Sequence, residues 1–92
     1  KIPDDTNVLI THGPAYGVHD LVKNSYNRDP HVGSKTLHYR KLAIQDSLKF
    51  HISGHIHEQG NCIEIRGNVT NVCPCIRDEN YKVANEPIII EI

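Results

Sequence analysis

Apolar residues in this chain occur in short runs separated by longer polar stretches, and each run predicts a strand or one face of a helix. Residues 7–12 form a mainly aliphatic run that a Gly-Pro pair stops, which predicts a strand buried on both faces. Residues 34–49 begin with Ser34, which is suited to cap a helix, and carry apolar side chains near helical spacing. Residues 50–53 then predict a second strand, which a glycine ends.

The second half of the chain follows the two-residue period that is typical of strands. Apolar and polar residues alternate over residues 62–66, turn-forming residues follow at 67–68, and residues 69–72 complete a predicted β-hairpin. Residues 87–92 predict a closing strand. The polar stretch at 15–33 is long for a connection, and long ordered loops in compact domains are usually functional. The pattern predicts the α/β class with a β-rich second half.

Charge and cysteine content narrow the function classes. The 92 residues carry 10 Lys plus Arg and 11 Asp plus Glu, which gives a formal net charge of −1. This balance offers no attraction to polymeric nucleic acid or anionic membranes, and no apolar run reaches the ~20 residues of a membrane helix. An odd number of cysteines (Cys62, Cys73 and Cys75) without a signal-peptide pattern favours a reduced, cytoplasmic setting.

Three histidines lie where predicted strands end. His12 closes the first strand, and His55 and His57 follow the second, two residues apart and therefore on one side of an extended segment. If the two strands are neighbours, all three imidazoles reach the same edge of the sheet, and imidazole nitrogen suits Zn, Mn, Fe, Co and Ni. A lone histidine at such a place is more often a hydrogen-bonded surface residue, but three of them in this pattern predict a metal site.

The segments around these histidines match known motifs. Thr-His-Gly-Pro at 11–14 and Ser-Gly-His-Ile-His-Glu at 53–58 resemble the C-terminal half of the calcineurin-like metallophosphoesterases. The resemblance narrows to a phosphodiesterase-like branch of metallophosphoesterase-domain proteins and their bacterial and phage relatives. Val-Gly-Ser at 32–34, Asn-Val-Cys at 71–73 and the closing segment 81–92 also match, in the same order. The likeness covers nearly the whole chain.

The resemblance implies a fold and a reaction. Residues 1–92 would be the C-terminal portion of a single domain, a layered α/β/β/α sandwich, to which they supply a mixed sheet, one main helix and a closing hairpin. The implied activity is metal-dependent hydrolysis of phosphodiesters, including cyclic nucleotides, or of phosphomonoesters. A metal-bound hydroxide would attack phosphorus at a dinuclear centre of Mn, Fe, Zn, Mg or Ni. His12 and His55 would bind one metal, and His57 would bind the other.

Further residues receive roles from their place beside these ligands. His31 and Gly33, in the loop expected to face the metals, are candidates for contact with the substrate, and a solvated loop histidine is the alternative interpretation of His31. Gly13, Gly54 and Glu58 are predicted to surround the metal ligands, with Glu58 able to orient an imidazole. By contrast, His19 and Asp20 are predicted to lie on the surface of the same loop.

The family's three N-terminal motifs, Asp-x-His, Gly-Asp-x-x-Asp and Gly-Asn-His, have no usable counterpart in this sequence. Asp29-Pro30-His31 matches the first motif by its letters, but it follows His12 and no buried strand precedes it. The chain alone is therefore predicted to be inactive and to need an N-terminal half from the same or a separate chain; a homo-oligomer is also possible. Two alternatives remain: a catalytically inactive half that binds or regulates a partner, and a small Cys/His zinc module built on Cys73 and Cys75.

Overall fold

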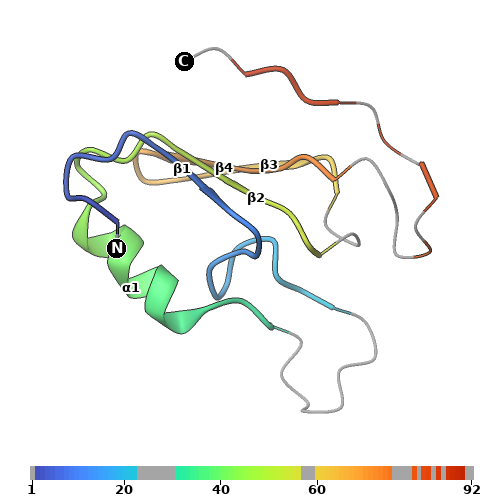
Figure 1. Ribbon diagram of the computed structural model, residues 1–92, viewed down its shortest axis with the longest axis horizontal. Helices are drawn as coiled ribbons and strands as arrows, with labels where there is room; N and C mark the ends of the chain where they lie inside the picture. The colour runs from blue at the N-terminus through green and yellow to red at the C-terminus, as the bar shows by residue number, and fades with distance from the viewer. Residues whose placement is uncertain are drawn as a thin grey trace.

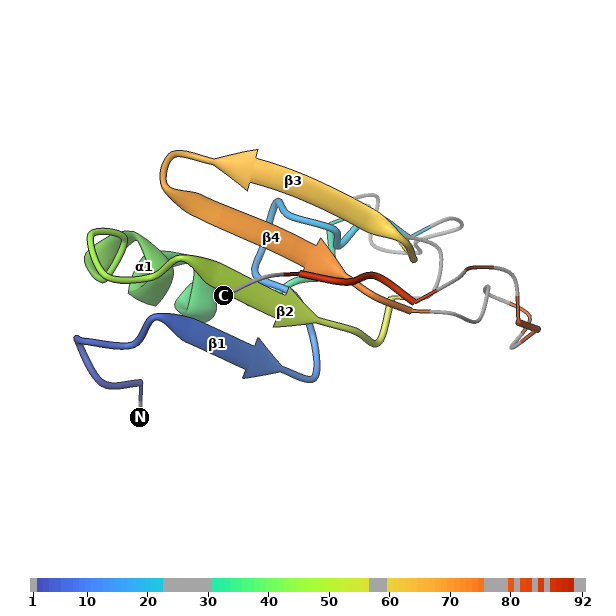
Figure 2. The same cartoon turned by 90° about the horizontal axis from the view of Figure 1, so that it is seen from above.

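The structure, a computed structural model, describes residues 2–22, 31–56, 60–75, 80, 82, 83, 85 and 87–90. Its centre is a four-stranded mixed sheet with the strand order β1-β2-β4-β3 (Figures 1 and 2). The strands are β1 (Val8–Thr11), β2 (Phe50–Ser53), β3 (Cys62–Arg66) and β4 (Val69–Cys73). Strands β1, β2 and β4 are parallel, and β3 pairs with β4 as an antiparallel hairpin. The α/β class and the predicted hairpin are confirmed.

The helix forms where it is predicted to begin but is shorter than expected. Helix α1 (Lys35–Ala43) starts behind Ser34, whose hydroxyl accepts a hydrogen bond from the Leu37 amide at 3.1 Å. The predicted end at residue 49 is wrong, because the chain turns after Ala43 through shorter-range bonds, such as that from the Ser47 amide to the Ile44 carbonyl. No helix in the described residues is long and apolar enough to span a membrane.

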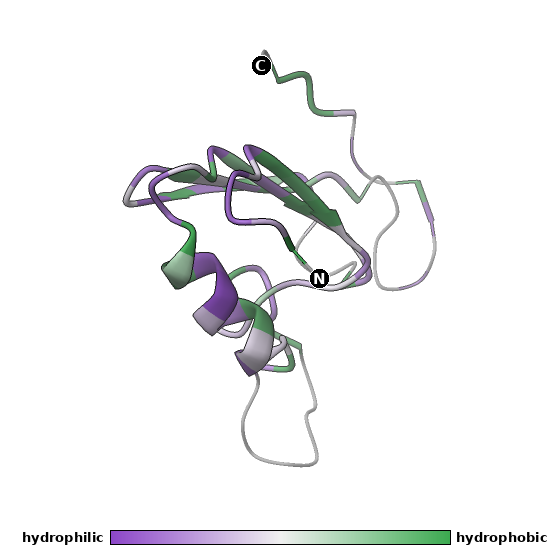
Figure 3. Ribbon diagram, turned by 60° about the vertical axis from the view of Figure 1, so that its left-hand side comes forward, coloured by the Kyte–Doolittle hydropathy of each residue, from purple (hydrophilic) through white to green (hydrophobic). Residues whose placement is uncertain are grey.

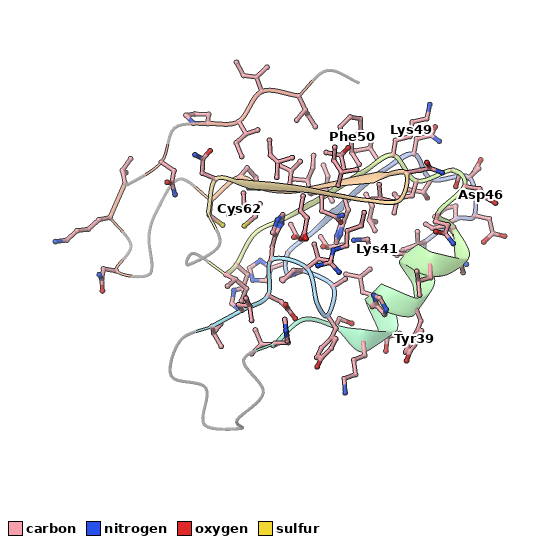
Figure 4. The ribbon with its side chains drawn as sticks, turned by 180° about the vertical axis from the view of Figure 1, so that it is seen from behind. Tyr39, Lys41, Asp46, Lys49, Phe50 and Cys62 are labelled. Carbon is pink, nitrogen blue, oxygen red and sulfur yellow. The ribbon has the colours of Figure 1, made fainter. Side chains whose placement is uncertain are left out.

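One face of the sheet packs against α1 and the turn that follows it. Ile44, Leu48 and Val69 are buried together, and Leu9 packs against them from β1. The buried residue of α1 itself is Lys41, whose side chain lies between the helix and the sheet (Figure 4). This core holds the helix against one face of the sheet (Figure 1).

The other face of the sheet is apolar and largely uncovered. Ile10 is 73% exposed, and Ile63 and Ile65 are 54% and 69% exposed. The prediction that the first strand is buried on both faces is therefore wrong for this chain. Figure 3 shows much apolar colour along the strands of the sheet, with α1 lying on one side of it.

The predicted closing strand is also absent from its described part. Residues 87–90 pass over the open face without joining a strand ladder, and Ile89 is 91% exposed (Figures 1 and 2). An apolar run becomes a strand only where a neighbouring strand offers hydrogen bonds, and this stretch has no such neighbour among the described residues.

Candidate metal centre

Two histidines meet at the carboxyl edge of the sheet. His12 directly follows β1, and His55 lies two residues beyond β2. Because β1 and β2 are parallel neighbours, their carboxyl ends lie side by side. Nε2 of His12 is 3.0 Å from Nδ1 of His55, the ring centroids are 4.5 Å apart, and both side chains are exposed. The predicted convergence of these two histidines is confirmed.

The distance between the two nitrogens fits a shared metal ion. Two imidazole nitrogens that each lie ~2.1 Å from one zinc-sized cation are roughly 3.0–3.4 Å apart. The nitrogens of His12 and His55 are 3.0 Å apart and share a hydrogen bond, so one ring donates the proton and the other accepts it. A cation between them would take the place of that proton. The pair is therefore suited to supply two ligands to one ion.

The backbone around His55 holds its ring beside His12. His55 has a φ of 70°, in the left-handed region that residues other than glycine seldom adopt. The Gly54 amide donates to the His12 carbonyl at 3.0 Å, and the Ile56 amide donates to the Gly54 carbonyl at 2.8 Å. Such strained positions are found preferentially at functional sites.

Not all of the remaining predicted site residues belong to the part of the chain that the structure describes. His57 and Glu58 lie outside the described residues, so their roles stay predictions. In the described part of the chain, no three His, Cys, Asp or Glu side chains are grouped to hold a metal ion. A Cβ at Gly54 would lie 3.7 Å from its nearest neighbours, and one at Gly13 would meet nothing within 4 Å. Close packing therefore does not explain these two glycines, and their place around the ligands stays a prediction.

A buried carboxylate closes the loop that begins after His12. Asp20 is 0% exposed and accepts hydrogen bonds from the Gly17 and Gly33 amides and from Nδ1 of His31, at 2.9, 3.0 and 2.7 Å. Burial alone would raise the pKa of Asp20, but these hydrogen bonds outweigh it and hold the pKa below its usual value. The prediction of a surface position for Asp20 is wrong, because the loop folds around this carboxylate.

The same loop fixes the two predicted substrate contacts. The His31 ring is held by Asp20 and lies 5.3 Å from the Tyr16 ring, centroid to centroid. The Gly33 amide donates a hydrogen bond to Asp20, and the backbone of Ala15 packs directly against Gly33. Both residues thus have structural partners, and their contact with a substrate stays a prediction.

Buried polar groups between α1 and the sheet were not predicted. Lys41 is 8% exposed and donates from Nζ to Oδ1 of Asn71 at 2.5 Å. Burial, aided by the positive charge of Arg66, lowers the pKa of Lys41 to about 8. His51 is 2% exposed with Nε2 2.8 Å from Oγ1 of Thr11, and burial followed by the Lys41 charge lowers its pKa to about 4. The sequence feature that could have indicated this buried polar group is Lys41, a basic residue at a helix position that faces the core.

The cysteines remain free thiols. Sγ of Cys73 lies 3.7 Å from Sγ of Cys75, and burial raises the pKa of Cys73 to about 12. A zinc site needs four ligands, mostly deprotonated thiolates or neutral imidazoles. The described residues place no such set around these two thiols.

The chain is similar in sequence to proteins that are named for a metallophosphoesterase domain. The chain is 36% identical over 92 residues to metallophosphoesterase domain-containing protein 1 of Homo sapiens, and equally to that of Mus musculus. It is 32% identical over 91 residues to UPF0046 protein T07D4.2 of Caenorhabditis elegans. Each alignment covers 99% of this chain but only 26% or 22% of the relative.

The chain therefore spans about a quarter of the length of the curated relatives it matches. No protein-family model matches it, and no solved structure gives a significant match. The alignments nevertheless run through both histidine motifs, since they cover nearly all of the chain. The resemblance of this chain to a segment of the metallophosphoesterase-domain proteins, first indicated by its histidine motifs, is thus confirmed.

Proposed function

We propose that this chain supplies His12, His55 and His57 to the divalent-metal centre of a phosphoesterase. The observation that carries the proposal is the meeting of His12 and His55 at neighbouring strand ends, with ring nitrogens 3.0 Å apart. His57 is included in the proposed ligand set only because it lies two residues after His55 in the sequence. The similarity to metallophosphoesterase-domain proteins supports the reaction class.

The histidines would act as neutral ligands. A ring nitrogen binds a cation through its lone pair, so protonation of His12 or His55 competes with metal binding. Divalent cations at such a centre stabilise the negative charge of phosphoryl oxygens during ester hydrolysis. The proposed substrates are small phosphodiesters, including cyclic nucleotides, or phosphomonoesters.

His31 is proposed to contact the substrate's phosphate. Its ring belongs to the loop that begins at His12, and a carboxylate only accepts hydrogen bonds, so Asp20 holds the proton on Nδ1. This contact fixes the orientation of the ring. A fixed ring loses little conformational entropy when it binds a ligand, which favours a positioning role.

The rest of the centre would come from another segment. No described carboxylate is grouped with the histidine pair, and a second metal needs bridging and terminal ligands of that kind. We infer that a segment carrying Asp-x-His, Gly-Asp-x-x-Asp and Gly-Asn-His motifs packs on the open sheet face around Ile10, Ile63 and Ile65. That arrangement would complete the layered sandwich.

The test is reconstitution. The chain is combined with a segment that supplies the three missing motifs, and hydrolysis of an aryl phosphodiester is measured with Mn²⁺. Losing a group that only orients a metal ligand costs 10–100-fold, so His12→Ala or His55→Ala should lower kcat/KM by at least about 100-fold. His57→Ala should do the same. Lys49→Ala, at an exposed position away from the histidines, is the matched control and should leave the rate unchanged.

Two results would reject this assignment. Activity that survives His12→Ala and His55→Ala would show that these residues are not ligands. A tight complex of the two segments with no hydrolysis of either ester class would instead favour the non-catalytic alternative, in which this half binds a partner without chemistry.

A further inference from the structure

A small cavity lies between α1 and the β3–β4 hairpin, apart from the histidine pair, and Val18, Leu42 and Val69 give it a mainly apolar wall. Its volume is about 80 Å³, and its polar lining comes from His38 and Lys41 of α1, Gln45 of the turn after α1, Arg66 of β3 and Asn71 of β4. Arg66 and Val69 flank the hairpin turn at the amino-terminal end of β4. The histidine pair lies beyond the carboxyl ends of β1 and β2, so the two places are separate.

The cavity holds one buried cation, Lys41, that no described carboxylate neutralises. Lys41 is 8% exposed, and its only hydrogen-bond acceptor among the described residues is the neutral amide oxygen of Asn71. Burial, and to a smaller degree the positive charge of Arg66, disfavours the charged form of Lys41 and lowers its pKa. A buried cation without a counter-charge is costly, and an anion would relieve that cost.

The carboxylates nearby do not neutralise Lys41. Glu64 pairs with Arg66 at 3.0 Å, and both side chains are about half exposed. Asp20 is occupied by His31 and two backbone amides. Within the described residues, therefore, no carboxylate is bonded to the Lys41 ammonium.

A second observation points to a missing hydrogen-bond partner in the same region. Nδ1 of His19 is buried and has no hydrogen-bond partner within the described part of the chain. Val18, the residue before His19, lines the cavity, whereas His19 itself is not among the lining residues. Its backbone φ of 53° lies in the left-handed region, so the loop holds the ring there at some conformational cost.

We propose that this cavity binds a free tetrahedral oxyanion, inorganic phosphate in the first instance. A volume of about 80 Å³ suits a single small ion. The lining supplies the ammonium of Lys41 and the planar guanidinium of Arg66, both strong donors to phosphate oxygens. The amide of Gln45 and the ring of His38 supply further hydrogen-bond donors. The inference does not rest on the proposed phosphoesterase function.

The experiment measures phosphate binding by the metal-free chain. Inorganic phosphate is titrated by calorimetry at constant ionic strength in the presence of EDTA, and one saturable site is expected. Lys41→Met should weaken binding by about 10-fold or more, because one charge-assisted contact is lost. Lys49→Met removes the same charge from an exposed position and should change the affinity by less than about 2-fold, because exposed charges are screened by salt.

Arg66→Gln provides a second variant at a half-exposed position, so that the conclusion does not depend on the folding of Lys41→Met. It should also weaken phosphate binding. Phosphate should bind more tightly as the pH falls below about 8, where Lys41 becomes protonated. The other titratable or charged groups around the cavity are His19 of the loop, His38 of α1, His51 of β2, and Glu64 and Arg66 of β3. In a parallel titration, glycerol phosphate should bind more weakly than free phosphate.

Three results would overturn the proposal. The first is the absence of saturable phosphate binding by the unmodified chain. The second is an unchanged affinity in both folded Lys41→Met and Arg66→Gln. The third is tighter binding of glycerol phosphate than of phosphate, which would assign the cavity to a phosphorylated small molecule instead of the free ion.

Discussion

Gly33 stands where the two ends of the long loop come together, and no side chain fits there. A Cβ at this position would lie 2.5 Å from the Ala15 carbonyl carbon and 2.7 Å from the Tyr16 amide nitrogen. Both are backbone atoms, which cannot rotate away as the end of a side chain can. The amides of Tyr16 and Ser34 also bond across this contact, to the Ser34 and Pro14 carbonyls.

We therefore expect Gly33→Ala to lower the free energy of unfolding by about 1–3 kcal/mol, the range for forcing an atom into a well-packed site. Gly13→Ala is the matched control, since its Cβ would meet nothing within 4 Å, and should change stability by less than about 0.5 kcal/mol. Urea unfolding of the two variants checks the difference. Equal losses at both positions would contradict the close contact.

His51 makes the stability of the fold depend on pH. Its pKa is about 4 in the folded chain and about 6.5 when exposed, so between these values the unfolded chain binds more protons. The free energy of unfolding should then fall as the pH drops from above 6.5 towards 4, by up to about 3 kcal/mol from this residue.

His51→Gln keeps a polar side chain but removes this titration, so its unfolding free energy should depend less on pH than that of the unmodified chain. Urea unfolding at pH 7 and at several lower values measures the difference. If the two proteins lose stability in parallel, the burial of His51 is not the cause of the acid sensitivity.

At the scale of elements, the apolar pattern predicted each strand of the sheet but not every boundary. Ile44 and Leu48 keep helical spacing and are buried, yet they lie in turns beyond α1, because short-range turns and a helix can bury the same residues. The run at 88–90 has strand composition but no strand ladder in its described part. Composition records a preference for extended backbone, whereas pairing depends on which edges the rest of the fold leaves open.

The open face of the sheet carries its own prediction. Ile65→Lys and Ile10→Lys place charges at positions that are 69% and 73% exposed, so each should alter the unfolding free energy of this chain by less than about 1 kcal/mol. The same substitutions should prevent association with the segment that is proposed to cover this face, because a buried unpaired charge is costly.

Analytical ultracentrifugation of the two-segment mixture measures this association. Tyr39→Lys adds a charge on the outer side of α1, where Tyr39 is 68% exposed, and should leave the complex intact. Figure 4 shows Tyr39 on the side of α1 that faces away from the sheet. Association that tolerates both isoleucine substitutions would place the partner elsewhere.

At the scale of the whole molecule, the candidate site could be predicted only as far as it follows from strand ends. His12 and His55 were predictable because parallel neighbours bring their carboxyl ends together. Asp20 was not, because its burial requires Gly17 and Gly33 to close around it from opposite ends of a loop. The burial of Lys41 could not be predicted either, because the cavity beside it exists only once the helix has packed against the hairpin. Side chains that depend on tertiary closure leave little trace in local pattern.

The parallel pairing of β1 with β2 also sets an order for folding. The β3–β4 hairpin joins neighbouring segments, and hairpins of this kind close in about 1–10 μs. The contact between His12 and His55 spans 43 residues and must await the closure of a much longer loop. The hairpin is thus available as an early nucleus, whereas the histidine pair can form only after β1 has paired with β2. A ligand that bridges the two rings would therefore recognise the finished fold and none of its precursors.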